Sequence, residues 1–281
     1  MYKFNGGLVN KMKIAILGFG NIGSAIGYGL VNSEFLKPND ITITKKSTKL
    51  LEELNNKGFI ALNDNKTAVS KNKIIILAVT PQQLNGLLSE IENVITDEHI
   101  IISVVSGARI KQIKSRFSKT VTVIRAMPNT AIAINESMTC IAYEKDTDND
   151  SVELTKKIFN SVGKTIEINE DLMGAATSLC ACGIAFFLRG IRAASQGGIE
   201  IGFSAEDALL MSAQTAKGAS GILLHGRKHP EREIDKVTTP RGITISGLNA
   251  MEHNGFSSAM ITGIVTAAVK AEKIYTNNME K

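Results

Sequence analysis

Three closely spaced glycines form the first motif in the chain that could do chemistry. Gly18-Phe19-Gly20-Asn21-Ile22-Gly23 fits the pattern G-x-G-x-x-G, follows a short apolar segment and precedes a segment compatible with a helix. Glycines at this spacing allow a tight turn and a close approach of a pyrophosphate, while the helix N-terminus supplies N–H donors. The pattern alone is also that of an ordinary glycine turn, but its position between strand and helix predicts a dinucleotide site.

The residues after the second expected strand bear on the choice between NAD and NADP. An NAD site usually carries an acidic residue about 20 residues after the glycines, at the end of that strand. Here the strand Ile41–Thr44 is followed by Lys45, Lys46 and Ser47, and Asp40 lies at its opposite end. Two ammonium groups and a hydroxyl suit the 2′-phosphate of NADP, although they could also form a solvated lysine pair. We therefore expect NADPH as the cofactor, with NADH less favoured.

A second candidate site lies in a turn-rich loop over residues 238–247. Pro240 and Gly242 predict a tight turn, and the residues that follow, to about Glu252, can begin a helix. Free N–H groups there, together with the hydroxyls of Thr239 and Thr244, could bind a carboxylate. The alternative is a plain helix–helix connection with an N-cap threonine.

Other chemistries find less support. None of the four tyrosines has a lysine four residues later, which argues against a short-chain dehydrogenase. Residues 172–188 contain no lysine, which argues against a β-hydroxyacid dehydrogenase. His225 and His229 have a metal-ligand spacing, but Pro230 follows and no third ligand is near, so no metal site is expected. Cys180 and Cys182 could be redox-active or bind metal, but small buried apolar residues are the favoured interpretation.

Composition and charge exclude several broad classes of protein. The 281 residues are 43% hydrophobic and 21% charged, which excludes wholesale disorder and suggests about two domains. The net charge of +5 is small and scattered, so nucleic-acid binding is not expected. No uninterrupted apolar run approaches the ~18 residues of a membrane span. Three cysteines without disulfide-like spacing favour a cytoplasmic location.

The elements that must position these residues fall into two groups. Up to residue 167, apolar strand-like segments alternate with helical ones, which predicts an α/β domain with a doubly wound, Rossmann-type sheet. From residue 168 to residue 281 we expect an all-helical domain, because residues 172–224 are rich in Ala, Gly, Leu and Met and lack strand-like alternation. Residues 1–11 are expected to be a mobile extension. The expected strands cover residues 13–17, 41–44, 73–79, 100–105 and 121–125, and the clearest expected helices cover residues 21–31, 47–56, 204–225 and 257–275.

Over residues 12–275 the chain resembles the pyrroline-5-carboxylate reductase family. The resemblance rests on the glycine motif and on four further segments in the same order. These are Ile76-Leu77-Ala78-Val79-Thr80-Pro81-Gln82, Arg125-Ala126-Met127-Pro128-Asn129-Thr130, Gln214-Thr215-Ala216-Lys217-Gly218-Ala219 and Thr239-Pro240-Arg241-Gly242-Ile243-Thr244-Ile245.

The resemblance implies hydride transfer from NADPH to the C=N carbon of 1-pyrroline-5-carboxylate, which gives L-proline in the last step of its synthesis. It also implies a homodimer whose helical domains exchange helices, or a larger oligomer of such dimers. Thr244 would bond the ring nitrogen and is the expected catalytic residue. The implied substrate residues are Thr239, Gly242, Ile243 and Thr244, and the implied additional cofactor residues are Asn65, Ala78, Val79, Thr80 and Pro81.

The chain also departs from the family pattern. A Ser-Gly-Ser-Gly-Pro-Ala-Tyr segment is replaced by Cys180-Ala181-Cys182-Gly183-Ile184-Ala185-Phe186, and Arg241 stands where the family has glycine. These changes leave two alternatives open. One is a relative that reduces another imino acid, and the other is a non-catalytic dimer that binds a dinucleotide.

Overall fold

The computed structural model describes residues 12–226 and 228–277, so the extension expected over residues 1–11 lies outside the described residues. The chain forms two compact units. Unit 1 is discontinuous and comprises the residues up to Ala181 together with those from Ala268 onward, and unit 2 comprises Cys182–Ala267. The last strand of unit 1 ends at Glu167, the residue expected as the boundary, and the units themselves divide after Ala181.

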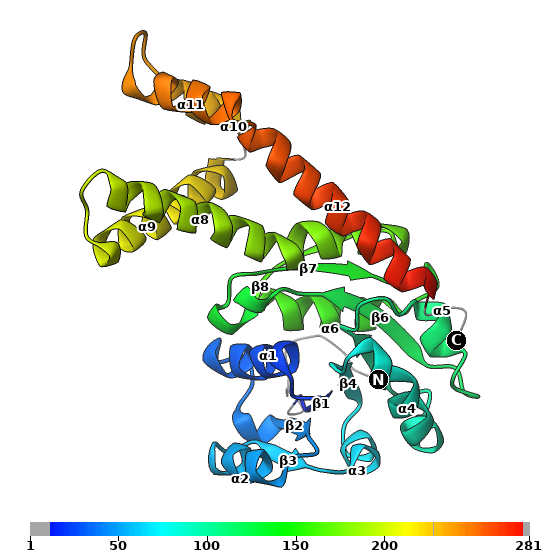
Figure 1. Ribbon diagram of the computed structural model, residues 1–281. Coiled ribbons are helices and arrows are strands. Elements are labelled where there is room, and N and C mark those ends of the chain that lie inside the picture. Colours follow the sequence, from blue (N-terminus) through cyan, green and yellow to red (C-terminus); the bar gives the residue numbers. More distant parts are fainter. Residues whose placement is uncertain (1–11, 227, 278–281) are drawn as a thin grey trace. The chain divides into compact units, whose positions relative to one another are not determined.

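Unit 1 contains an eight-stranded sheet in the order β3-β2-β1-β4-β5-β6-β7-β8 (Figure 1). Adjacent strands are parallel except β6 and β7, which are antiparallel. The strand order reverses direction between β1 and β4, as in a doubly wound dinucleotide-binding sheet, so the expected Rossmann-type fold is confirmed. The strands are β1 Ile14–Leu17, β2 Ile41–Thr44, β3 Ile60–Leu62, β4 Ile74–Leu77, β5 Ile100–Ser103, β6 Thr122–Met127, β7 Ser137–Ala142 and β8 Gly163–Glu167.

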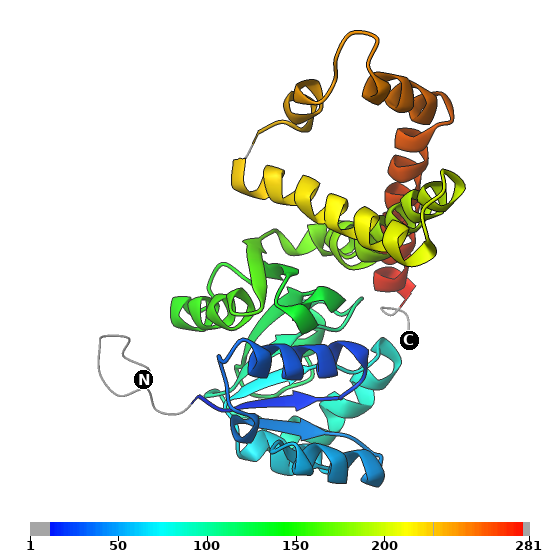
Figure 2. The ribbon, with the colours of Figure 1, turned by 90° about the vertical axis from the view of Figure 1, so that its left-hand side faces the viewer.

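The central strands are uninterrupted apolar runs because helices cover both faces of the sheet. Ile14 and Ile16 pack with one helical layer, made by α1 (Asn21–Asn32), α2 (Thr48–Asn56) and α6 (Asn149–Asn160). Ala15 and Leu17 pack with the other, made by α3 (Asn65–Ser70), α4 (Pro81–Ile91) and α5 (Ile110–Lys114). Figure 2 shows α1, in dark blue, alongside the strands. This double cover fixes the strand ends that carry the candidate cofactor residues.

Three strands were not expected from the sequence. β3 is short, and β8 is half exposed and begins at Gly163, so neither has a continuous apolar run. β7 mixes Ser and Thr with apolar residues and pairs antiparallel with β6. The five expected strands correspond to β1, β2, β4, β5 and β6. The bounds of β2 are as expected, whereas the strand expected over residues 73–79 ends earlier, at Leu77.

The helical part of the chain begins with α7 (Met173–Ala176) and a π-helical stretch over Thr177–Cys182. The later helices are α8 Gly183–Glu200, α9 Ala205–Gly226, α10 Pro230–Lys236, α11 Ile243–His253 and α12 Phe256–Asn277. The positions of α9 and α12 confirm the expected helices. Because α11 already begins at Ile243, the loop expected over residues 238–247 is shorter than the sequence suggested.

Residues 170–200 correct one expectation. This helical segment contains an 18-residue window with a mean hydropathy of 1.7, so by length and composition it could cross a membrane. The segment has no long uninterrupted apolar run, because polar and small residues are interspersed along it. Only 22% of that window is buried, so its apolar surface needs a covering of some kind.

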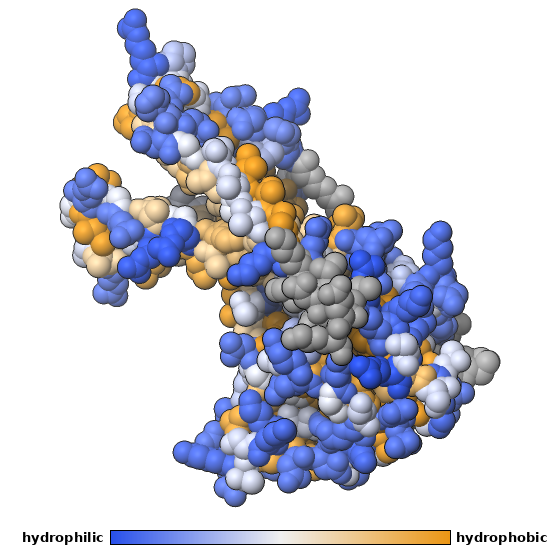
Figure 3. Space-filling view, turned by 45° about the vertical axis from the view of Figure 1, so that its right-hand side comes forward, coloured by the Kyte–Doolittle hydropathy of each residue, from blue (hydrophilic) through white to orange (hydrophobic). Residues whose placement is uncertain are grey.

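Unit 2 encloses an apolar groove of about 950 Å³ lined by α8, α9, α11 and the start of α12. Phe187, Met211, Met251 and Met260 are among its lining residues. Other large apolar side chains of this unit are exposed, including Leu188, Leu210, Leu224 and Ile261. Figure 3 shows orange and tan side chains along these helices. Exposed apolar surface on this scale indicates a docking face for another protein surface.

Candidate cofactor and substrate sites

The glycine motif forms the turn between β1 and α1. Gly18 has a φ of +97°, and a Cβ there would lie 2.8 Å from the carbonyl oxygen of Ala78. A Cβ on Gly23 would lie 2.1 Å from the carbonyl oxygen of Gly18, so α1 packs directly on the turn. A Cβ on Gly20 would meet nothing within 4 Å. The turn is thus closed on the protein side and open on the side where a pyrophosphate would lie.

The end of β2 joins this turn. The Gly18 N–H donates to Oγ1 of Thr44 (3.3 Å), and Nζ of Lys45 donates to the carbonyl oxygen of Phe19 (2.9 Å). Lys46 and Ser47 are exposed, and their side chains have no partner within the described part of the chain. The two lysines therefore differ, because Lys45 supports the glycine turn whereas Lys46 is free to meet a ligand.

Asn65 and Thr80 lie at helix N-termini near the same edge of the sheet. Asp64 caps α3 by accepting hydrogen bonds from the N–H groups of Lys66 and Thr67, and the Thr67 hydroxyl holds the pKa of this carboxyl below its usual value. Asn65 is held by Oε2 of Glu90, at 2.9 Å from its Nδ2. Thr80 donates from its hydroxyl to Oε1 of Gln83 (3.1 Å) at the start of α4.

The predicted cofactor residues thus all follow the carboxyl ends of four adjacent parallel strands, β3-β2-β1-β4. That is the edge at which doubly wound sheets bind ligands. They are Gly18, Phe19, Gly20, Asn21, Ile22, Gly23, Lys45, Lys46, Ser47, Asn65, Ala78, Val79, Thr80 and Pro81.

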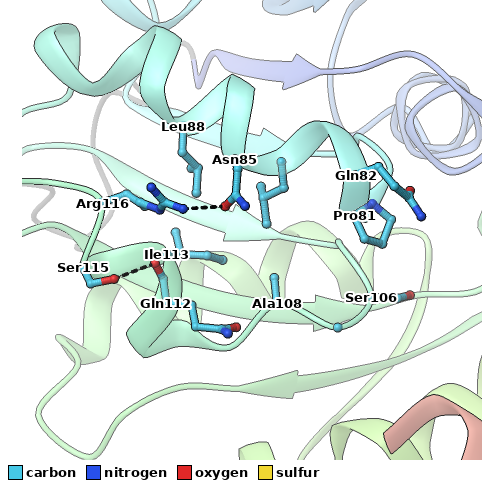
Figure 4. Close-up of a pocket in the computed structure, with 12 residues that line it drawn as sticks. Pro81, Gln82, Asn85, Leu88, Ser106, Ala108, Gln112, Ile113, Ser115 and Arg116 are labelled. Carbon is cyan, nitrogen blue, oxygen red and sulfur yellow. Dashed lines mark hydrogen bonds between the residues drawn. The ribbon is translucent and has the colours of Figure 1, made fainter. Parts of the chain in front are cut away.

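A further pocket of about 630 Å³ lies between α4 and α5, with Pro81 at its edge (Figure 4). Its cation, Arg116, donates to Oδ1 of Asn85 (3.1 Å), and Ser115 donates to the carbonyl oxygen of Gln112 (2.9 Å). The twelve described residues that line the pocket include no acid, histidine or cysteine. We therefore place no reaction step there.

The predicted substrate residues lie in unit 2, around the N-terminus of α11. The N–H of Gly242 donates to the carbonyl oxygen of Thr239 (2.8 Å), which closes the turn, and Arg241 has a φ of +61°. No side chain caps α11. Ile243 is 93% exposed, and the hydroxyl of Thr244 has no partner within the described residues. This turn therefore presents free N–H and hydroxyl groups, as a carboxylate site requires.

Sequence reasoning missed the residues that support these sites. Thr44 and Glu90 hold Gly18 and Asn65, and only the pairing of β2 with β1 brings Thr44 to the turn. It also missed that Cys180 meets Cys140, at an Sγ–Sγ distance of 3.8 Å, across forty residues of sequence. The two histidines with metal-ligand spacing hydrogen-bond backbone groups. Nδ1 of His225 bonds the carbonyl oxygen of Gly221 within α9, and Nδ1 of His229 accepts from the N–H of Glu231 at the start of α10.

The doubly wound sheet and its glycine turn define a protein of the dinucleotide-binding class, joined here to a helical unit with an exposed apolar face. Residues 170–274 match the family model for pyrroline-5-carboxylate reductase dimerisation, and residues 13–107 match that for coenzyme F420-dependent NADP oxidoreductases.

Two relatives from Dictyostelium discoideum each match 95% of the chain. Pyrroline-5-carboxylate reductase 1 is 52% identical, and this chain spans 50% of its length. Pyrroline-5-carboxylate reductase 2 is 48% identical, over 94% of its length. A crystal structure of a Plasmodium falciparum pyrroline carboxylate reductase with NADP bound superposes with a TM-score of 0.86 at 25% identity, covering 96% of this chain and all of that one. The chain belongs to the pyrroline-5-carboxylate reductase family.

Proposed function

We propose that this chain reduces 1-pyrroline-5-carboxylate to L-proline with NADPH, as an oxidoreductase acting on a CH–NH bond. The observation that carries the proposal is the exposed turn before α11, in a chain of this family. Gly242 closes this turn, and the hydroxyls of Thr239 and Thr244 and the N–H of Ile243 have no partner within the described residues. A protein that only bound a dinucleotide would have no need for this second set of donors. The retained hydroxyls therefore favour an enzyme over a non-catalytic dimer.

The glycine turn of unit 1 fits a dinucleotide. Gly18 and Gly23 leave no room for a Cβ on the protein side, while the backbone at Gly20 is open. The first N–H groups of α1 have no side-chain cap, so they can donate to a pyrophosphate. NADPH supplies the hydride when bound. The other predicted residues of this edge, from Asn65 to Pro81, would complete the cofactor site.

Lys46 and Ser47 are our candidates for binding the 2′-phosphate of NADPH. Both are exposed and unpaired within the described residues, and β2 ends in Thr44 rather than in an acid that would bind the ribose of NAD. Lys45 contributes mainly by holding the Phe19 carbonyl. NADH remains the less favoured cofactor, because it offers no phosphate to these groups.

On the substrate side, the N–H groups at the start of α11 and the hydroxyl of Thr239 would hold the carboxylate. Thr244 would orient the imine nitrogen. A hydroxyl is a weak acid, so Thr244 can fix the ring or pass on a proton from water more readily than supply its own. The main contribution of these residues is positioning, because holding two reactants in the correct geometry removes much of the entropic barrier.

We also propose a homodimer built on the helical domain, residues 168–281, with residues 1–167 as the NADP-binding domain. The apolar groove and exposed side chains of unit 2 lie within the segment that matches the dimerisation model. A partner chain would cover them, as it would the apolar helix over residues 170–200. A cytoplasmic location stays a prediction.

The test is loss of NADPH absorbance with purified protein and 1-pyrroline-5-carboxylate, with NADH in parallel and proline identified by mass. Rapid turnover, faster with NADPH, is expected. Turnover only with other cyclic or acyclic imino acids would support the relative of altered specificity. Binding of NADPH without turnover of any imine would overturn the enzymatic proposal.

A further inference from the structure

Two thiols of unit 1 face each other next to the start of the helical segment. Cys140 lies in β7 and is only 3% exposed, whereas Cys180 lies in the π-helical stretch and is partly exposed. Their Sγ atoms are 3.8 Å apart, within van der Waals contact of two sulfur atoms. Cys180 replaces a serine of the family pattern, so this contact is a property of the present chain.

The surroundings of the two thiols differ. Cys140 packs with Met127, Met173 and Ala176 in an apolar cluster. Its hydrogen bond to Cys180 and its burial raise the pKa of Cys140, so it remains a thiol. The same hydrogen bond lowers the pKa of Cys180 to about 7, so much of Cys180 is thiolate at neutral pH. The more exposed sulfur is thus the nucleophile and the buried one the proton-bearing neighbour.

Closing a disulfide requires a small movement at Cys180. A disulfide has an S–S length of about 2 Å, so the two sulfur atoms must approach by about a further 2 Å. Cys180 lies in a π-helical stretch, a rare geometry that is frequent at functional sites. The carbonyl of Cys180 is meanwhile held by Nδ2 of the buried Asn129 (3.2 Å), which keeps this residue over β7.

We propose that Cys140 and Cys180 form a peroxide-sensitive dithiol that closes into an intramolecular disulfide. The Cys180 thiolate attacks one oxygen of hydrogen peroxide, the O–O bond breaks, and Cys180 becomes a sulfenic acid. The hydroxide that leaves takes up from solvent the proton that the Cys180 thiol had released, which forms the first water. The sulfur of Cys140 then attacks the Cys180 sulfur and the S–O bond breaks. The thiol proton and the leaving hydroxide form water. Overall two thiols are oxidised, one peroxide is reduced and two waters form.

The test uses the full-length protein with hydrogen peroxide, followed by alkylation with iodoacetamide and non-reducing peptide mass mapping. The expected product is a Cys140–Cys180 linked peptide, two hydrogens lighter than the separate peptides, with Cys182 alkylated and free thiols falling from three to one. Dithiothreitol should restore all three. Stable sulfinic or sulfonic acid on Cys180 with Cys140 alkylated would overturn the proposal, as would a Cys180–Cys182 or inter-subunit link.

Variants and a pH profile sharpen this result. Cys182→Ser is the matched control and should form the disulfide normally, whereas Cys180→Ser and Cys140→Ala should form none. In the unmodified protein, alkylation of Cys180 should rise with a midpoint near pH 7, below the ~8.5 of a free cysteine. A midpoint at ~8.5 or above would contradict the assignment of Cys180 as the attacking thiolate. Mass is the readout throughout, so the result is independent of whether the reductase proposal holds.

Discussion

The cofactor edge of unit 1 and the substrate turn of unit 2 are built in opposite ways. At the cofactor edge, β1 and β4 are fully buried and the glycine turn is fixed by backbone contacts, such as that between Gly18 and Gly23. The proposed substrate turn is exposed, and the hydroxyl of Thr244 has no hydrogen-bond partner within the described residues. A substitution that adds atoms on the closed side of the glycine turn should therefore change folding and binding together, whereas loss of the Thr244 hydroxyl should change chemistry alone.

The largest effect is expected for Gly23→Ala. A Cβ would lie 2.1 Å from the carbonyl oxygen of Gly18, and backbone of two packed elements cannot move aside cheaply. We expect a loss of about 3 kcal/mol or more in the free energy of unfolding, at or above the usual range for overpacking. Chemical denaturation, followed by circular dichroism, measures it.

Gly20→Ala is the matched control, because its Cβ meets nothing within 4 Å in the protein. Its stability should stay close to that of the unmodified chain, while its affinity for NADPH falls because the methyl group enters the space of the pyrophosphate. If Gly20→Ala unfolds as readily as Gly23→Ala, the turn is not closed on one side and open on the other.

The same contrast explains what the sequence could and could not predict. The strand–glycine–helix pattern and the apolar runs of β1, β2 and β4 depend on local residues and on burial, so these elements could be predicted from the sequence. The partners Thr44 and Glu90 were not, because they are brought in by strand pairing and helix packing. At the substrate turn, composition predicted the turn itself, but the positive φ of Arg241 follows only from the structure.

Thr244→Ala should separate chemistry from stability. If Thr244 orients the imine, turnover should fall by about 100-fold, the lower end for a positioned catalytic group. The dissociation constant of NADPH and the melting temperature should hardly change, because the hydroxyl has no partner in the described residues. Steady-state kinetics and cofactor fluorescence measure both.

Ser246→Ala is the comparison variant in the same helix. Its hydroxyl bonds the carbonyl oxygen of Gly242 (3.2 Å), so its loss tests removal of a hydroxyl from this turn without touching Thr244. Near-normal turnover is expected. Equal losses in the two variants would show that the start of α11, rather than the Thr244 hydroxyl, governs the rate.

The two lysines after β2 should respond differently. Lys46→Ala should lower the affinity for NADPH by about 10-fold or more and leave the affinity for NADH unchanged. The reason is that a hydrogen bond to a charged group contributes about 1.5–3 kcal/mol. Lys45→Ala removes the bond to the Phe19 carbonyl and should weaken both cofactors to a similar, smaller extent. Titration of each variant with both cofactors is decisive. A selective loss of NADPH in Lys45→Ala alone would reverse the assignment.

The smallest effect on stability is expected for Arg241→Gly, which tests why the chain has an arginine at a position with left-handed backbone geometry. A φ of +61° costs a residue with a Cβ about 1 kcal/mol, and glycine relieves it but gains freedom in the unfolded chain. We expect a net stabilisation of at most about 1 kcal/mol, whereas Arg241→Ala keeps the strain and should gain none. If both variants lose affinity for the imino acid to the same degree, the guanidinium contributes to the carboxylate site and the backbone strain is tolerated for that reason. If neither does, Arg241 faces solvent, and the strain is a removable cost of this sequence.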